Sequence, residues 1–192
     1  MSANQQPGPQ SGKVLPGMRL ALLMLLLCAP GAVPVTFADT PGEVQVGETL
    51  PEATMQGLNG PPRKLSEYRG TPLIINVWAS WCSPCRAEMA SLERLSWMEL
   101  ATRFNVIGIS TDDYPEKAKD ALQTSNATIT HFIDAKLQLE NMLGASRLPL
   151  TVLVDADGRV LKKIYGAREW DAPQAVQWIT ETFGANALQS GD

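Results

Sequence analysis

The chain has 192 residues, of which 44% are hydrophobic and 19% are charged, a composition that suits one globular domain with additional segments. Its formal net charge is −4, and it contains no basic tract, internal repeat, low-complexity run or phosphate-binding glycine loop. A chain of this charge has no electrostatic basis for binding nucleic acid, so nucleic acid is not an expected partner.

Residues 1–38 have the composition of an export signal. They contain two basic residues and no acidic ones, and the basic residues precede an apolar stretch at 20–29 with the length of a signal-peptide core. Small residues at and before Ala38 favour cleavage after that residue. We therefore expect the protein to be periplasmic, or membrane-associated and facing the periplasm if residues 20–38 are kept as a membrane tether.

The mature domain is predicted to begin with a hairpin extension. Proline, glycine and threonine among scattered apolar residues indicate short strands near Glu52–Leu58 and Arg63–Leu65, and then a turn of helix at Ser66–Tyr68. Leu73–Ala79 follows as an apolar run with isoleucine and valine, which is typical of a strand buried on both faces.

Two cysteines, Cys82 and Cys85, come directly after this strand with two residues between them. Pro84 suits the first turn of a helix, and a good helical sequence follows it. The strand therefore brings Cys82 to a helix N-terminus, where free backbone N–H groups and the helix dipole stabilise a thiolate. The only other cysteine is Cys28, inside the predicted signal, so this pair is expected to act as a reactive dithiol.

The remainder of the chain alternates strands and helices. In order, the predicted elements are an amphipathic helix at Arg86–Phe104, a strand at Asn105–Thr111, a helix at Glu116–Thr124 capped by the turn Asp112–Pro115, a strand at Thr130–Ile133, a helix at Leu137–Leu143, a hairpin of Leu150–Asp155 and Val160–Tyr165, and a helix at Ala172–Phe183. This order predicts an α/β sandwich with a mixed central sheet. The cysteines lie at the C-terminal end of its first core strand, where open α/β sheets place their active sites.

The segment Trp78-Ala79-Ser80-Trp81-Cys82-Ser83-Pro84-Cys85 closely resembles the thioredoxin motif W-A-x-W-C-x-P-C. Its surroundings resemble the TlpA/ResA-like branch of exported thiol–disulfide oxidoreductases, through Lys64–Gly70, Asn76, Cys85–Met89, an inserted αβ unit near 115–134, and Leu148–Thr151. The resemblance implies a thioredoxin-like fold over residues 39–184, with a mixed central sheet flanked by helices, an N-terminal hairpin extension and the inserted αβ unit. Residues 185–192 form a polar tail.

The resemblance also implies roles around the cysteines. Cys82 would attack a partner's disulfide and Cys85 would resolve the mixed disulfide. Pro149 would follow a cis peptide bond from Leu148 and face the cysteines, although a proline at a strand edge is an alternative interpretation. The residues expected to form the docking surface for a client protein are Trp81, Ser83, Pro84 and Leu148.

Glu88 is the candidate proton acceptor. It follows Cys85 by one helical turn, and in relatives a glutamate here lies close to the buried thiol, where burial raises its pKa and lets it take a proton from Cys85. A solvated surface glutamate is the alternative interpretation. Asn76 occupies the strand position where thioredoxins bury an aspartate, and its neutral amide cannot accept that proton.

The function expected from these features is reduction of specific protein disulfides on the periplasmic side, for example in cytochrome c maturation. The partners are client proteins with disulfides and a membrane electron donor of the disulfide-reductase type, and no cofactor is expected. Two alternatives stay open. A thiol peroxidase on the same fold lacks its usual Thr/Ser–Cys arrangement here, and a copper-binding metallochaperone would use Cys82, Cys85 and the isolated His131, which is more simply explained as a structural residue.

Overall fold

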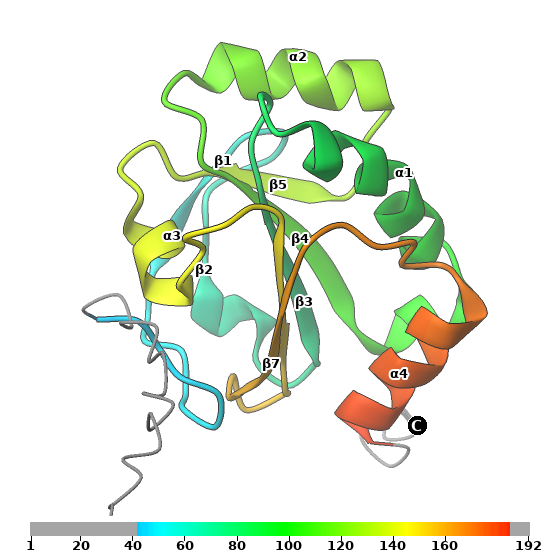
Figure 1. Ribbon diagram of the computed structural model, residues 1–192. Helices are drawn as coiled ribbons and strands as arrows, with labels where there is room; N and C mark the ends of the chain where they lie inside the picture. The colour runs from blue at the N-terminus through cyan, green and yellow to red at the C-terminus, as the bar shows by residue number, and fades with distance from the viewer. Residues whose placement is uncertain (1–41, 185–192) are drawn as a thin grey trace, which may run out of the picture. The chain divides into compact units, whose positions relative to one another are not determined.

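The computed structural model describes residues 42–184, which form a mixed seven-stranded sheet and four α-helices (Figure 1). The elements are β1 (Thr54–Gly57), β2 (Arg63–Lys64), η1 (Leu65–Tyr68), β3 (Leu73–Trp78), α1 (Ser83–Ser96), η2 (Glu99–Arg103), β4 (Asn105–Ser110), α2 (Pro115–Ser125), β5 (Thr130–Ile133), α3 (Gln138–Leu143), β6 (Leu150–Val154), β7 (Val160–Tyr165) and α4 (Pro173–Phe183). The predicted signal at 1–38 and the tail at 185–192 lie outside the described residues. No helix within 42–184 is long and apolar enough to cross a membrane.

The strands lie in the order β2-β1-β5-β4-β3-β6-β7. β3 pairs in parallel with β4 and antiparallel with β6, and β4 pairs in parallel with β5. The β1–β2 hairpin extends the sheet beyond β5, the strand of the inserted αβ unit. The mixed sheet, the hairpin extension and the inserted unit are therefore confirmed.

β3 is the centre of the molecule, and all six of its residues are buried. Its side chains alternate between two apolar clusters, as the period of a strand requires. Leu73, Ile75 and Val77 belong to the cluster that also contains residues of α3, whereas Ile74 belongs to the cluster of α1 and α4. Helices on both faces of the sheet (Figure 1) explain why this strand is apolar at every position except Asn76.

The prediction of one helix over Arg86–Phe104 is wrong. α1 ends at Ser96, the backbone of Met98 is extended with φ −71° and ψ 148°, and η2 follows as a separate 3-10 helix. The apolar spacing continues across this break because Phe104, with neighbours from η2, packs into the same cluster as α1. Periodicity alone could not show that the chain changes direction.

The turn Asp112–Pro115 leads into α2 as predicted, but none of its side chains caps the helix. Tyr114 holds the N-cap position of α2 without a side-chain hydrogen bond, and Pro115 is the first helical residue, where a missing N–H costs nothing. The buried Asp112 side chain instead accepts hydrogen bonds from the Ser80 backbone N–H (2.8 Å), the Ser80 hydroxyl (2.6 Å) and the Ser110 hydroxyl (2.7 Å). It fixes the loop that leads to Cys82.

A prediction concerns the close approach of β4 and β5. Gly108 lies opposite His131, and a Cβ on Gly108 would lie 2.0 Å from His131 Nδ1. We expect Gly108→Ala to displace the imidazole and to lower the free energy of unfolding by about 1–3 kcal/mol in a urea titration. Gly60→Ala is the matched control, because its Cβ would meet nothing within 4 Å. Equal stabilities for both variants would contradict the packing described here.

Candidate active site

Cys82 and Cys85 form a disulfide at the N-terminus of α1, with an S–S distance of 2.00 Å and a Cα–Cα distance of 5.3 Å. Cys82 is the N-cap residue, and its Sγ accepts a hydrogen bond from the Cys85 backbone N–H at 3.2 Å. Cys82 is 6% exposed and Cys85 is fully buried. Cys82 is therefore the sulfur that an incoming partner can reach.

The predicted docking residues lie around this disulfide. Trp81 is 71% exposed, and Ser83 and Pro84 are exposed beside it. Leu148 is half-buried and packs against the apolar cluster that contains both cysteines. The Leu148–Pro149 peptide bond is cis, and Pro149 itself is buried, with its carbonyl accepting a hydrogen bond from the Gly166 N–H at 2.9 Å.

Glu88 is buried, which excludes the interpretation of a solvated surface glutamate. Its Oε1 accepts a hydrogen bond from Asn76 Nδ2 at 2.8 Å, and its Oε2 accepts from Trp170 Nε1 at 3.0 Å and from the Arg168 backbone N–H at 3.1 Å. Desolvation raises the pKa of the Glu88 carboxyl above its ordinary value, and the hydrogen bonds and the Arg168 charge oppose part of this rise. Burial thus favours the neutral form of this carboxyl more than water would.

Asn76 orients the Glu88 carboxyl by donating a hydrogen bond to it. The Asn76 amide nitrogen donates to Glu88 and also to Thr151 Oγ1 on β6, at 3.1 Å. An amide that donates through its nitrogen holds the carboxylate in place but cannot take up a proton from a thiol.

The sequence did not predict that the segment before α4 supplies hydrogen-bond donors to Glu88. Trp170 is fully buried and donates its indole N–H to Glu88, while Ser91 of α1 holds the same segment by bonding to the Arg168 carbonyl (3.1 Å) and the Trp170 N–H (3.0 Å). The available signal was one large aromatic residue within the otherwise polar sequence Arg168–Asp171. Nothing in the sequence pointed to Ser91.

His131 lies beneath Trp78. Its buried Nδ1 accepts a hydrogen bond from Trp78 Nε1 at 3.1 Å, its Nε2 has no partner among the described residues, and burial lowers its pKa to about 4. Within residues 42–184, no three histidine, cysteine, aspartate or glutamate side chains come together in a metal-binding arrangement. The geometry gives the copper-binding alternative no support.

Comparisons with known proteins agree with this site. The Redoxin family model matches residues 45–179. The thiol-disulfide oxidoreductase ResA of Geobacillus thermodenitrificans is 30% identical over 150 residues, which cover 78% of this chain and 86% of that protein. The thiol:disulfide interchange protein DsbE of Vibrio cholerae is 32% identical over 133 residues, which cover 66% of this chain and 70% of that protein.

A solved structure extends the likeness to three dimensions. A DsbE-type thiol:disulfide interchange protein from Chlorobium tepidum superimposes with a TM-score of 0.67 and 27% sequence identity, over 74% of this chain and 100% of that chain. The family match, the relatives and the Cys82–Cys85 disulfide lead to one conclusion. The chain belongs to the Redoxin family, as a thiol–disulfide oxidoreductase of the ResA/DsbE type with a thioredoxin-like fold.

Proposed function

We propose that this oxidoreductase is exported and reduces specific disulfides of client proteins on the periplasmic side, with cytochrome c maturation as one setting. The observation that carries the proposal is a reachable Cys82 joined to a buried Cys85, with the buried carboxyl of Glu88 one helical turn further along α1. A membrane electron donor of the disulfide-reductase type would return the pair to its dithiol form.

The reaction begins with the reduced enzyme. The Cys82 thiolate, stabilised at the N-terminus of α1, attacks one sulfur of the client disulfide, and the other client sulfur leaves as a thiolate. The Cys85 thiol then gives its proton to the Glu88 carboxylate and attacks Cys82 Sγ, which releases the second client thiolate. Two electrons have passed to the client, and the enzyme is left with the disulfide seen here.

The position of Glu88 supports reduction as the direction of the reaction. A negative charge near Cys85 disfavours a thiolate at that sulfur. Because it destabilises the dithiol form relative to the disulfide, it makes the pair a better electron donor. Oxidant enzymes of this fold rely on the opposite effect, a stabilised thiolate.

The client would bind across the disulfide. Trp81 and Pro84 offer an exposed apolar surface on the α1 side, with the polar Ser83 beside them, and Leu148 borders the cysteines on the β6 side. Pro149 sets the course of the chain into β6, against which an extended client segment would lie.

We predict distinct behaviour for the two cysteines. Cys82→Ala should lower the rate of insulin reduction by dithiothreitol to that of the uncatalysed reaction, because it removes the nucleophile. Cys85→Ala should accumulate mixed disulfides that non-reducing electrophoresis detects. Cys28→Ala is the control and should retain wild-type activity, since Cys28 precedes the proposed cleavage site. Mixed disulfides that form with Cys82→Ala in place of Cys85→Ala would reverse the assigned roles.

Glu88→Gln tests the proton acceptor. Loss of the negative charge should lower the pKa of the Cys85 thiol, and at neutral pH the loss of the acceptor should slow resolution of the mixed disulfide by about tenfold or more. Thiol titration and stopped-flow measurement of client release check both effects. An unchanged thiol titration would remove Glu88 from the mechanism.

Trp170→Phe is the companion variant, because it keeps an aromatic ring and deletes one donor to Glu88 Oε2. The lost hydrogen bond favours the protonated carboxyl, so the pKa of Glu88 should rise further and the pH profile of resolution should move to higher pH. A purely structural role for Trp170 would change stability without moving that profile.

Export yields a separate prediction. Expression in a Gram-negative host should place the protein in the periplasmic fraction, and mass spectrometry of the intact product should give Asp39 as the first residue. Substituting Ala38 by a bulky residue is the matched test and should leave a longer, membrane-attached form. Recovery of the full chain in the cytoplasm would contradict the export proposal.

A further inference from the structure

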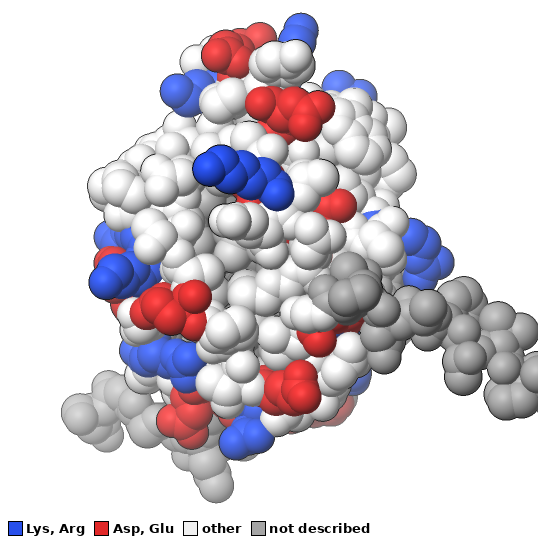
Figure 2. Space-filling model, turned by 90° about the vertical axis from the view of Figure 1, so that its left-hand side faces the viewer, with Lys and Arg blue, Asp and Glu red and all other residues white. Residues whose placement is uncertain are grey.

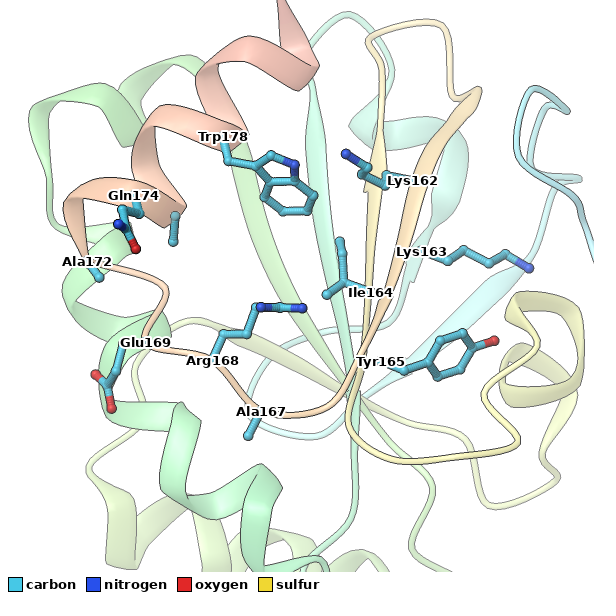
Figure 3. A pocket seen from close by; sticks show the side chains of 11 residues that line it. Lys162, Lys163, Ile164, Tyr165, Ala167, Arg168, Glu169, Ala172, Gln174 and Trp178 are labelled. Carbon is cyan, nitrogen blue, oxygen red and sulfur yellow. The ribbon is translucent and has the colours of Figure 1, made fainter. Parts of the chain in front are cut away.

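A groove with a volume of ≈ 700 Å³ lies between β7 and α4, apart from the disulfide (Figure 3). Lys162 and Ile164 enter it from β7, Gln174 and Trp178 from α4, and Arg168 from the segment between them. Apart from Arg168, whose backbone N–H donates to Glu88 and whose charge lowers the pKa of Glu88, no residue of this groove took part in the reaction described above.

The groove contains two cationic side chains, one of which lies over an aromatic ring. Lys162 Nζ lies 4.4 Å from the centre of the Trp178 ring, and the exposed side chain of Arg168 points into the groove toward β7 (Figure 3). The Arg168 guanidinium makes no hydrogen bond or ion pair with any described residue. Ile164 is buried and supplies an apolar floor. The groove thus combines free positive charge with apolar surface.

The other charged residues at the groove are already paired. Glu169 forms an ion pair with Arg94 at 3.1 Å and points away from the groove, and Lys163 points to the opposite side of β7 (Figure 3), where it contacts Glu43. The unpaired charge inside the groove is therefore positive.

This charge contrasts with the rest of the domain. The chain after residue 38 has 14 basic and 20 acidic residues, and on the face shown in Figure 2 the two signs are interspersed. A local pair of cations on an acidic protein attracts a segment of opposite charge and orients it as it approaches.

The groove is continuous with the active site through the backbone of residues 166–168. Gly166 donates its N–H to the Pro149 carbonyl at 2.9 Å, and Arg168 donates its N–H to Glu88 Oε2 at 3.1 Å. A polypeptide that crosses the disulfide beside Pro149 and continues over this segment would reach the groove.

We propose that the groove between β7 and α4 binds an extended acidic segment of the client protein. A carboxylate of that segment lies between Lys162 and Arg168, and an apolar side chain rests on Trp178 and Ile164. The identification of the occupant as a client rests on the proposed reductase function. The groove would then select clients by a sequence remote from their cysteines.

A direct binding experiment tests the site without any redox chemistry. Two cysteine-free peptides, alike except that one carries glutamates where the other carries glutamines, are titrated by calorimetry into the disulfide form of the protein. The acidic peptide should bind at least about threefold more tightly, and Lys162→Gln or Arg168→Gln should each weaken it about two- to fivefold. Lys119→Gln removes an exposed charge from α2 and should have no effect. Equal affinities for the two peptides, or equal losses in all three variants, would overturn the proposal.

A turnover experiment separates this proposal from the reductase function. Disulfide-bonded versions of the two peptides are offered to the reduced enzyme, and the ratio of their kcat/KM values is measured in the wild type and in Lys162→Gln. A ratio that favours the acidic peptide, and that falls in Lys162→Gln, supports the binding of an acidic client segment in the groove. Reduction of both peptides at equal rates would support the reductase function and contradict client binding in the groove. Binding that depends on Lys162, without reduction of either peptide, would support peptide binding in the groove and contradict the reductase function.

Discussion

The carboxyl of Glu88 connects parts of the fold that are far apart in sequence. Burying a carboxyl group is costly unless hydrogen bonds replace its lost water, and here the donors come from β3 and from the segment before α4. The cost of burial is therefore offset only when β3, α1 and the C-terminal segment are all in place. The same carboxyl lies one helical turn beyond Cys85, so the contacts that complete the fold also set the pKa of a carboxyl next along the helix from the dithiol.

A second buried carboxylate anchors the chain on the other side of the cysteines. Asp112, at the end of β4, holds the backbone and hydroxyl of Ser80, two residues before Cys82. The redox pair thus lies between two fixed points, Ser80 before it and Glu88 after it. The pair can open and close by rotation of its side chains while the backbone on both sides stays in place, which suits a site that alternates between two covalent states.

The features that the sequence predicted were those encoded locally. An apolar run identified β3, the C-x-x-C spacing after it identified the redox pair, and two apolar segments four residues apart identified the hairpin of β6 and β7. Local rules failed where a distant partner decided the outcome. Asp112 resembled a helix cap but binds Ser80, 32 residues earlier, and Trp170 reaches Glu88 across 82 residues. The groove also eluded prediction, because Lys162 and Trp178 belong to elements whose packing no short pattern records.

The two edge strands of the sheet determine whether another extended chain can pair with it. An open sheet edge is a template for any extended chain, and proteins protect it with short strands or with charged residues. At one end β2 is only two residues long, and at the other β7 carries the exposed Lys162. The short strand at one end and the charged side chain at the other therefore limit the pairing of a foreign strand with this sheet.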